Sequence, residues 1–125
     1  MTVALRNQSG SVLVVEDDVR ALDALTDLLE GSGYTVQKAQ NGHEALEEAK
    51  GRPPGMILLD LSMPVMDGWE FMRQQRLEPT IADIPVVVIT ALVSAVPAGA
   101  KALVTKPINV NRLMSLIEKY CALQG

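Results

Sequence analysis

The chain has almost no cysteine and almost no histidine. Cys121 is the only cysteine and His43 the only histidine among 125 residues. An internal disulfide and a cysteine-based metal cluster are therefore excluded, and a Ser-His-Asp triad has a single histidine to draw on. No apolar run approaches the roughly 20 residues that a membrane-spanning helix needs. Residues 1–10 lack the basic start and apolar stretch of a signal peptide, so we expect a cytoplasmic protein.

The chain also lacks an excess of positive charge. Its acidic residues outnumber its basic residues and give a net charge of −4, which leaves no basic footprint for direct binding to nucleic acid. A content of 48% hydrophobic and 21% charged residues is typical of a globular protein. We expect a polar N-terminal lead over residues 1–10 and one domain over residues 11–125.

Strand-like and helix-like segments alternate along the whole chain. Apolar or alternating runs predict strands at residues 11–16, 34–39, 56–60, 84–90 and 102–105. Helical spacing and capping residues predict helices over residues 19–30, 41–50, 67–77 and 109–123. This order predicts an α/β fold, a doubly wound parallel sheet with helices on both faces. Pro97 and Gly99 interrupt the connection between the last two strands, so a fourth helix there should be short or irregular.

Polar residues follow the apolar strands at the point where each strand ends. The acidic pair Glu16-Asp17, the acid Asp60, Thr90 and Lys106 all stand at such positions. In an open parallel sheet the carboxyl ends of the strands meet, and ligands bind there. Three converging carboxylates repel one another, which raises at least one pKa unless a cation binds. Mg²⁺ prefers such oxygen ligands, and lysine and threonine side chains suit a phosphoryl group.

These motifs together resemble the response-regulator receiver domain of two-component signalling. The matching segments are Val-Val-Glu16-Asp17, Leu-Leu-Asp60-Leu-Ser-Met-Pro-Val-Met-Asp-Gly68, Val-Val-Ile-Thr90-Ala91 and Lys106-Pro107, and the resemblance covers about residues 11–123. It implies a flavodoxin-like fold of five parallel strands in the order 2-1-3-4-5. It also implies a phosphoprotein that acts in a two-component system or a phosphorelay.

The resemblance assigns the metal and the phosphoacceptor. Asp60 is expected to take a phosphoryl group, in an Mg²⁺-dependent reaction, from a phosphohistidine on a histidine kinase or a histidine phosphotransfer protein. Asp17 and Asp60 are expected to bind Mg²⁺ directly and Glu16 mostly through water, with the backbone carbonyl of Ser62 as a further ligand. No external substrate is implied, so the chain is expected to phosphorylate itself rather than act as an ordinary enzyme.

The resemblance also assigns the residues around the phosphoryl group. Lys106 and Thr90 are expected to contact it, and Ala91 leaves the pocket open. The Lys106-Pro107 peptide bond is expected to be cis, as is typical of the family. Asp18 follows the metal-binding pair and is left out of the site.

The chain departs from the family pattern at two places. Leu103 occupies a position, three residues before the lysine, where the family usually carries Tyr or Phe, and the fourth helix of the usual output face is curtailed. We therefore hypothesise that the signal leaves by another surface or that the phosphoryl group is passed on. A monomer is favoured, because receivers often dimerise through the curtailed face.

Two other functions remain open from the sequence. The first is a pseudo-receiver, a protein-binding module that never carries phosphate. The second is an Mg²⁺-dependent phosphatase with a phosphoaspartate intermediate, although Ser62 stands where such enzymes commonly have a second aspartate. The sequence also leaves open a stand-alone regulator, which the Met1 start slightly favours, or a domain of a hybrid kinase.

Overall fold

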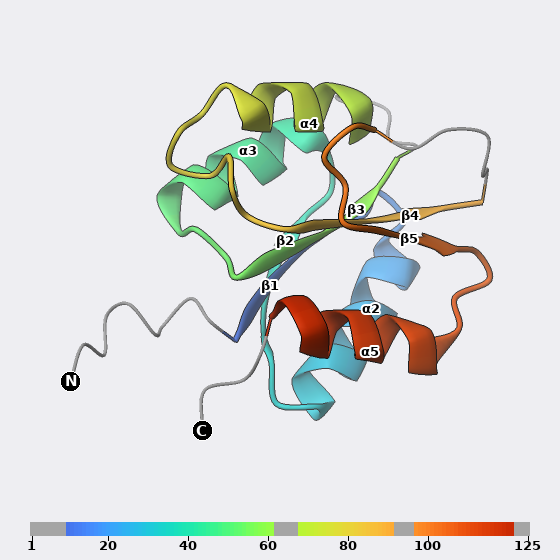
Figure 1. The fold of residues 1–125 in the computed structure, drawn as a ribbon. Helices are drawn as coiled ribbons and strands as arrows, with labels where there is room; N and C mark the ends of the chain where they lie inside the picture. Colours follow the sequence, from blue (N-terminus) through green and yellow to red (C-terminus); the bar gives the residue numbers. More distant parts are fainter. Residues whose placement is uncertain (1–9, 62–67, 92–96, 122–125) are drawn as a thin grey trace.

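A parallel sheet of five strands forms the centre of the molecule (Figure 1). The computed structural model describes residues 10–61, 68–91 and 97–121. The strands within these ranges are β1 (Ser11–Val15), β2 (Thr35–Ala39), β3 (Met56–Asp60), β4 (Val86–Thr90) and β5 (Ala102–Thr105). They pair in the order β2-β1-β3-β4-β5, and every pair is parallel. The predicted fold class and strand order are therefore confirmed.

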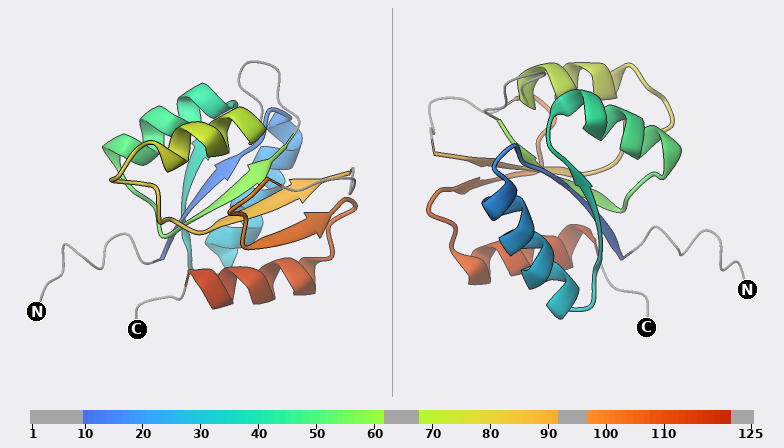
Figure 2. Two further views of the ribbon diagram at one scale, coloured as in Figure 1. Left: turned by 45° about the horizontal axis from the view of Figure 1, so that its top comes forward. Right: turned by 180° about the vertical axis from the view of Figure 1, so that it is seen from behind.

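Helices cover both faces of this sheet. The described residues form α2 (Val19–Gly31), α3 (Gly42–Gly51), α4 (Gly68–Arg76) and α5 (Val110–Tyr120). In Figure 2, α3 and α4 lie on one face of the sheet and α2 and α5 on the other. The last predicted helix was expected to reach Leu123, but residues 122–125 lie outside the described residues.

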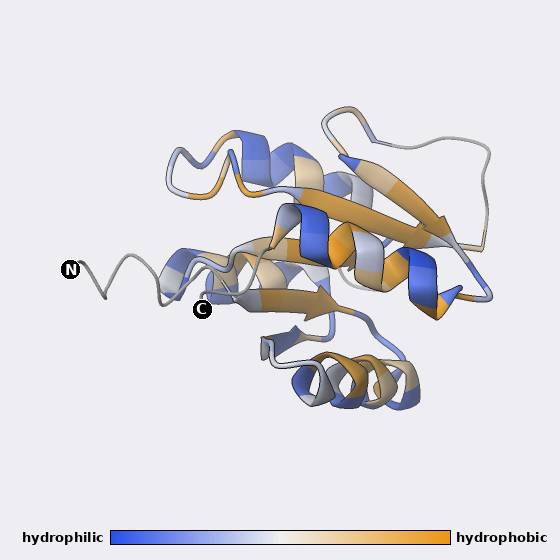
Figure 3. Ribbon diagram, turned by 60° about the horizontal axis from the view of Figure 1, so that its bottom comes forward, coloured by the Kyte–Doolittle hydropathy of each residue, from blue (hydrophilic) through white to orange (hydrophobic). Residues whose placement is uncertain are grey.

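Two apolar layers result from this arrangement. On one face the core includes Phe71 of α4 and Ala45 of α3, and on the other it includes Leu29 of α2 and Ile117 of α5. All residues of β1, β3 and β4 are buried, as expected for strands covered on both faces. Figure 3 shows these strands as apolar ribbons, with apolar and polar residues alternating along the helices.

Side-chain caps start three helices at the carboxyl ends of the strands. The Asp18 carboxylate accepts hydrogen bonds from the backbone N–H groups of Arg20 and Ala21 at the start of α2. Asn41 caps α3 and Asn109 caps α5 in the same way, as the sequence predicted. Such caps satisfy N–H groups that have no partner within the helix, and they fix where each helix leaves the sheet edge.

The connection between β4 and β5 is short. Its described residues, Ala91 and residues 97–101, contain a turn and no helix. Gly99 has a φ of 95° in this turn, a conformation that favours glycine. Residues 92–96, over which a short or irregular fourth helix was expected, lie outside the described residues.

None of the helices in the described part of the chain is long and apolar enough to cross a membrane.

Candidate functional site

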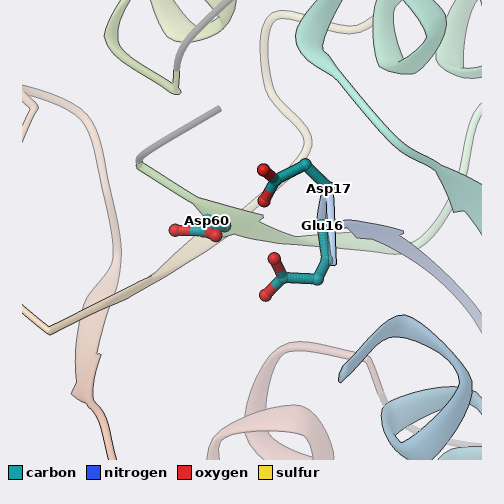
Figure 4. A group of neighbouring side chains, drawn as sticks. All are labelled: Glu16, Asp17 and Asp60. Carbon is teal, nitrogen blue, oxygen red and sulfur yellow. The ribbon is translucent and has the colours of Figure 1, made fainter. Parts of the chain in front are cut away.

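Three acidic side chains meet at the carboxyl end of the sheet. Glu16 and Asp17 follow β1, and Asp60 ends the neighbouring strand β3. One carboxylate oxygen of each residue lies within 4.8 Å of those of the other two, and Figure 4 shows the three side chains directed to the same space. Glu16 and Asp60 are buried, whereas Asp17 is exposed. The predicted convergence is confirmed, and it forms a cluster of carboxylate oxygens with two buried members and one exposed member.

Lys106 supplies a positive charge to this group. Its Nζ lies 3.5 Å from Glu16 Oε1 and 3.5 Å from Asp60 Oδ2. The Lys106 backbone N–H donates a hydrogen bond to the carbonyl of Thr90, the last residue of β4. The Lys106-Pro107 peptide bond is cis, as predicted from the resemblance. We call the set Glu16, Asp17, Asp60, Thr90 and Lys106 the carboxyl-edge site.

The position of α4 depends on a glycine that directly contacts the end of β3. A Cβ atom added to Gly68 would lie 2.8 Å from the Cα of Leu61 and 2.9 Å from the carbonyl oxygen of Asp60. The Gly68 backbone N–H also donates to the carbonyl of Leu61. A larger residue would push α4 away from Asp60, so the absence of a side chain at Gly68 helps to set the geometry of the site.

Burial and charge change the acidity of the site. Burial and the hydrogen bond with Asp60 raise the pKa of Glu16 from 4.5 to about 7, although the N–H of Asp18 partly opposes this rise. Burial alone would lower the pKa of Lys106, but the charges of Asp60 and Glu16 raise it above its usual value. One lysine therefore does not fully compensate three clustered carboxylates. A hard divalent cation with oxygen ligands would do so, and the donor set fits Mg²⁺.

Two residues have structural roles that were not predicted from the sequence. Asp18, which the sequence left out of the site, caps α2 and donates its backbone N–H to Glu16 Oε2 at 3.2 Å. Gly68 was recognised as part of a motif, but its contact with Asp60 depends on tertiary packing. Ser62, a predicted metal ligand, lies outside the described residues.

The sequence matches the family model of the response regulator receiver domain over residues 12–118. The chain belongs to this family. The polar-differentiation response regulator DivK of Brucella anthropi is 33% identical over 116 residues, which cover 88% of this chain and 94% of that protein. This receiver domain is thus related in sequence to a response regulator of nearly the same length.

Solved structures show the same likeness. Chemotaxis protein CheY4 of Vibrio cholerae aligns with a TM-score of 0.81 at 28% identity, covering 89% of this chain and 98% of that one. The signal receiver domain of a signal transduction histidine kinase from Syntrophus aciditrophicus has a TM-score of 0.81 at 30% identity, with 90% of each chain covered. The chain is a receiver domain of two-component signalling. Receiver domains generally bind Mg²⁺ in an acidic pocket, and three acids cluster at the carboxyl end of the sheet here.

Proposed function

We propose that this receiver domain accepts a phosphoryl group from a phosphohistidine onto Asp60. The observation that carries the proposal is the position of Asp60: its carboxylate is buried, lies 3.5 Å from Lys106 Nζ and is close to two further acids, of which Asp17 is exposed. A carboxylate in this setting can act as a nucleophile. The donor would be a histidine kinase or a histidine phosphotransfer protein, the partners typical of the family.

The transfer would exchange one bond to phosphorus for another. An oxygen of Asp60 bonds to phosphorus as the phosphorus–nitrogen bond breaks, and the imidazole leaves with that electron pair and takes up a proton. The Lys106 ammonium would stabilise the charge on the phosphoryl oxygens, and the Thr90 hydroxyl would donate a hydrogen bond to one of them. The Lys106 N–H bond to the Thr90 carbonyl ties these two residues together.

The metal would be held by the acids of the pocket. Asp17 and Asp60 are the proposed direct ligands, with Glu16 acting through water and Ser62 through its backbone carbonyl. Mg²⁺ in this position would supply positive charge that neutralises the carboxylates and the incoming phosphoryl oxygens. Because Asp17 is exposed while Glu16 and Asp60 are buried, the cluster can be reached from solvent on the side of Asp17.

An apolar groove beside the site supports a protein donor. The groove has a volume of about 510 Å³ and lies between α2 and the start of α5. Its lining residues are Glu16, Ala21, Ala24, Leu25, Leu28, Lys106, Pro107, Ile108 and Val110. Glu16 and Lys106 belong to the carboxyl-edge site, so the groove is continuous with it. An apolar helix seated there would bring its histidine near Asp60.

Intact-protein mass spectrometry after incubation with Mg²⁺ and acetyl phosphate tests the proposal. We expect one added phosphoryl group in the wild type and none in Asp60→Asn. Asp18→Asn is a matched control, because asparagine caps a helix as well as aspartate does, and it should be labelled like the wild type. An adduct in Asp60→Asn would refute the assignment of the acceptor. No adduct with either acetyl phosphate or a phosphohistidine protein would indicate a pseudo-receiver.

A further inference from the structure

The strand β2 forms one margin of the sheet. Figure 2 shows it there, with α3 on one face of the sheet and α2 on the other. Among the described residues, β1 is the only strand that pairs with β2. The N–H of Thr35 and the carbonyl of Ala39 both bond toward the β1 side, and neighbouring residues of a strand alternate in direction. The N–H and carbonyl groups of Val36 and Lys38 therefore face outward, as is typical of an edge strand.

A hollow lies at the carboxyl end of this strand. It has a volume of about 370 Å³ and is bordered by α2, β2 and the start of α3. Val19 and Leu22 give it an apolar side, while Asp23, Lys38 and Glu44 bring charges of both signs to it. These three charged residues are exposed. The hollow thus offers both packing space and charge next to the outward backbone groups of Lys38.

Unpaired acids surround this part of the strand. Residues 16–48 contain nine acidic residues but only two basic ones. Along α2, which packs on β2, exposed acids recur on successive turns at Asp23, Asp27 and Glu30. Neither these three nor Glu44 forms an ion pair with a described residue. The margin therefore carries negative charge that is available to a partner.

The charge decides which kind of partner fits this margin. A nucleic acid would be repelled by the acids, and a second copy of this chain would bring two acid-rich margins together. A basic segment would be attracted. Lys38 is the exception, since it forms no ion pair with a described residue either. A lysine on an edge strand opposes indiscriminate pairing, so it should weaken the binding of a basic segment without preventing it.

We propose that the outer side of β2 binds an extended, basic segment of a partner protein, which adds a strand to the sheet. Its backbone would exchange hydrogen bonds with Val36 and Lys38, and its cationic side chains would lie near Asp23 and Glu44. Added strands gain affinity from such main-chain bonds and specificity from neighbouring side chains. We call the outer side of β2, together with Asp23 and Glu44, the β2 edge.

This binding would be separate from phosphoryl transfer. The apolar groove lies between α2 and α5, whereas the hollow lies between α2 and β2. A segment paired with β2 therefore leaves the groove open to a phosphohistidine protein. The proposal goes beyond the proposed function and does not depend on it, because no residue of the β2 edge belongs to the carboxyl-edge site. Binding can be measured on the unphosphorylated full chain.

The probe is a short fluorescein-labelled peptide in which lysine alternates with valine. Its control is the same peptide with N-methyl groups on alternate residues, which keeps the charge but blocks strand pairing. In the ¹⁵N-labelled chain, the peptide should slow amide hydrogen exchange of Val36 and Lys38 about tenfold or more. Gln37, whose backbone faces β1, should change little. This readout detects backbone bonds rather than a general attraction of cations to an acidic chain.

Two substitutions at Lys38 separate charge from backbone bonding. Lys38→Gln removes the opposing charge and keeps the N–H, so the peptide should bind about threefold more tightly, since exposed charge pairs are weak. Lys38→Pro removes the same charge and also the outward N–H. Proline is tolerated on an edge strand where its nitrogen faces solvent, and circular dichroism checks that the variant is folded. We expect it to bind about tenfold more weakly than Lys38→Gln.

The acids are tested by neutral variants of the same size. Asp23→Asn combined with Glu44→Gln should weaken the peptide Kd about tenfold, since two exposed charges are lost. Glutamine can still accept the hydrogen bond that Glu44 accepts from the N–H of Gln40. Asp83→Asn is the matched control. Asp83 is exposed and precedes β4, three strands away from β2, so its charge is screened and the Kd should stay within about twofold.

Several results would overturn the proposal. The first is the absence of peptide binding, and the second is equal binding of the N-methylated peptide. Unchanged exchange at Val36 and Lys38, equal affinity of Lys38→Pro and Lys38→Gln, or an equal loss in Asp83→Asn would do the same. Sedimentation of the free chain tests the other occupant. Self-association that Lys38→Pro abolishes would show that the β2 edge pairs with a second copy of this chain rather than with a partner protein.

Discussion

The carboxyl-edge site and the β2 edge use charge in opposite ways. At the carboxyl edge, Glu16 and Asp60 are buried, lie close together and change the acidity of their neighbours. At the β2 edge, Asp23 and Glu44 are exposed and form no ion pair with a described residue. Burial strengthens each electrostatic interaction, whereas exposure weakens it but leaves the charge available. The comparison indicates that the first region suits chemistry and the second suits recognition.

The largest expected effect is the loss of stability when alanine replaces a glycine beside the carboxyl-edge site, compared with a glycine in the β4–β5 connection. The two substitutions test how tightly the backbone is packed at each place. Gly68→Ala should lower the free energy of unfolding by about 2 kcal/mol, because its Cβ would overlap the backbone of Asp60 and Leu61. Gly99→Ala, in the β4–β5 connection, should lower the free energy of unfolding by about 1 kcal/mol. An added Cβ has room there, but a φ of 95° is unfavourable for alanine. Urea unfolding measures both values.

Gly51→Ala is the control for these two substitutions. A Cβ there has no atom within 4 Å, and alanine favours the helix by about 0.5–1 kcal/mol, so no loss of stability is expected. If Gly99→Ala lowered the free energy of unfolding more than Gly68→Ala, the inference that the backbone is more tightly packed at Gly68 would be wrong.

A smaller effect concerns metal affinity. Asp17→Asn should weaken Mg²⁺ binding by about tenfold or more, since even outer-shell changes commonly cost 10–100-fold. Lys101→Gln should leave it unchanged, because an exposed charge outside the pocket is screened by salt. Trp69, the only tryptophan, follows Gly68 and is 45% exposed, so its fluorescence can report the titration. An equal loss of Mg²⁺ affinity in Asp17→Asn and Lys101→Gln would show that the charge of Asp17 has no special role in binding the metal.

A separate prediction concerns a buried group that belongs to neither region. Burial raises the pKa of the Cys121 thiol from 9.0 to about 11, and its Sγ donates to the carbonyl of Ser11. The folded chain therefore favours the protonated thiol. Its contribution to the free energy of unfolding is complete below pH 9 and is lost as the pH rises to about 11.

Labelling with a disulfide reagent at pH 8 measures this shift. The native thiol should react about 100-fold more slowly than the unfolded one, because the thiolate fraction falls with the pKa difference. Cys121→Ala should also remove the corresponding part of the pH dependence between pH 9 and 11. Rapid native labelling would show that burial does not suppress ionisation.

Local sequence signals predicted most of the fold. Apolar runs located the strands, and Asn41 and Asn109 marked helix starts that the structure confirms. The errors are at boundaries. Tyr34 was assigned to a strand, but its N–H bonds to the carbonyl of Leu29 and so completes the end of α2. Pro85 was also assigned to a strand; it has no N–H to donate, and β4 begins one residue later.

The sequence also predicted which residues meet at the carboxyl edge. Parallel strands that end in acids or lysine bring those residues to a common edge whatever the details of packing, and Glu16, Asp17, Asp60 and Lys106 meet there. The contact of Gly68 with Asp60 could not be predicted, because it depends on distances of about 3 Å between distant segments. Asp18, by contrast, stands directly before the helix that it caps, and an aspartate in that position is a local signal that the sequence does carry.

The sequence by itself therefore determined the alternation of strands and helices, the strand ends that carry chemistry and the uneven distribution of acids. Periodicity and residue type act locally, so these features can be read along the chain. Only the tertiary structure decided that Asp23 of α2 and Glu44 of α3 lie beside Lys38 in one hollow. Burial and proximity between distant segments are properties of the folded chain, and they set the acidity of Glu16.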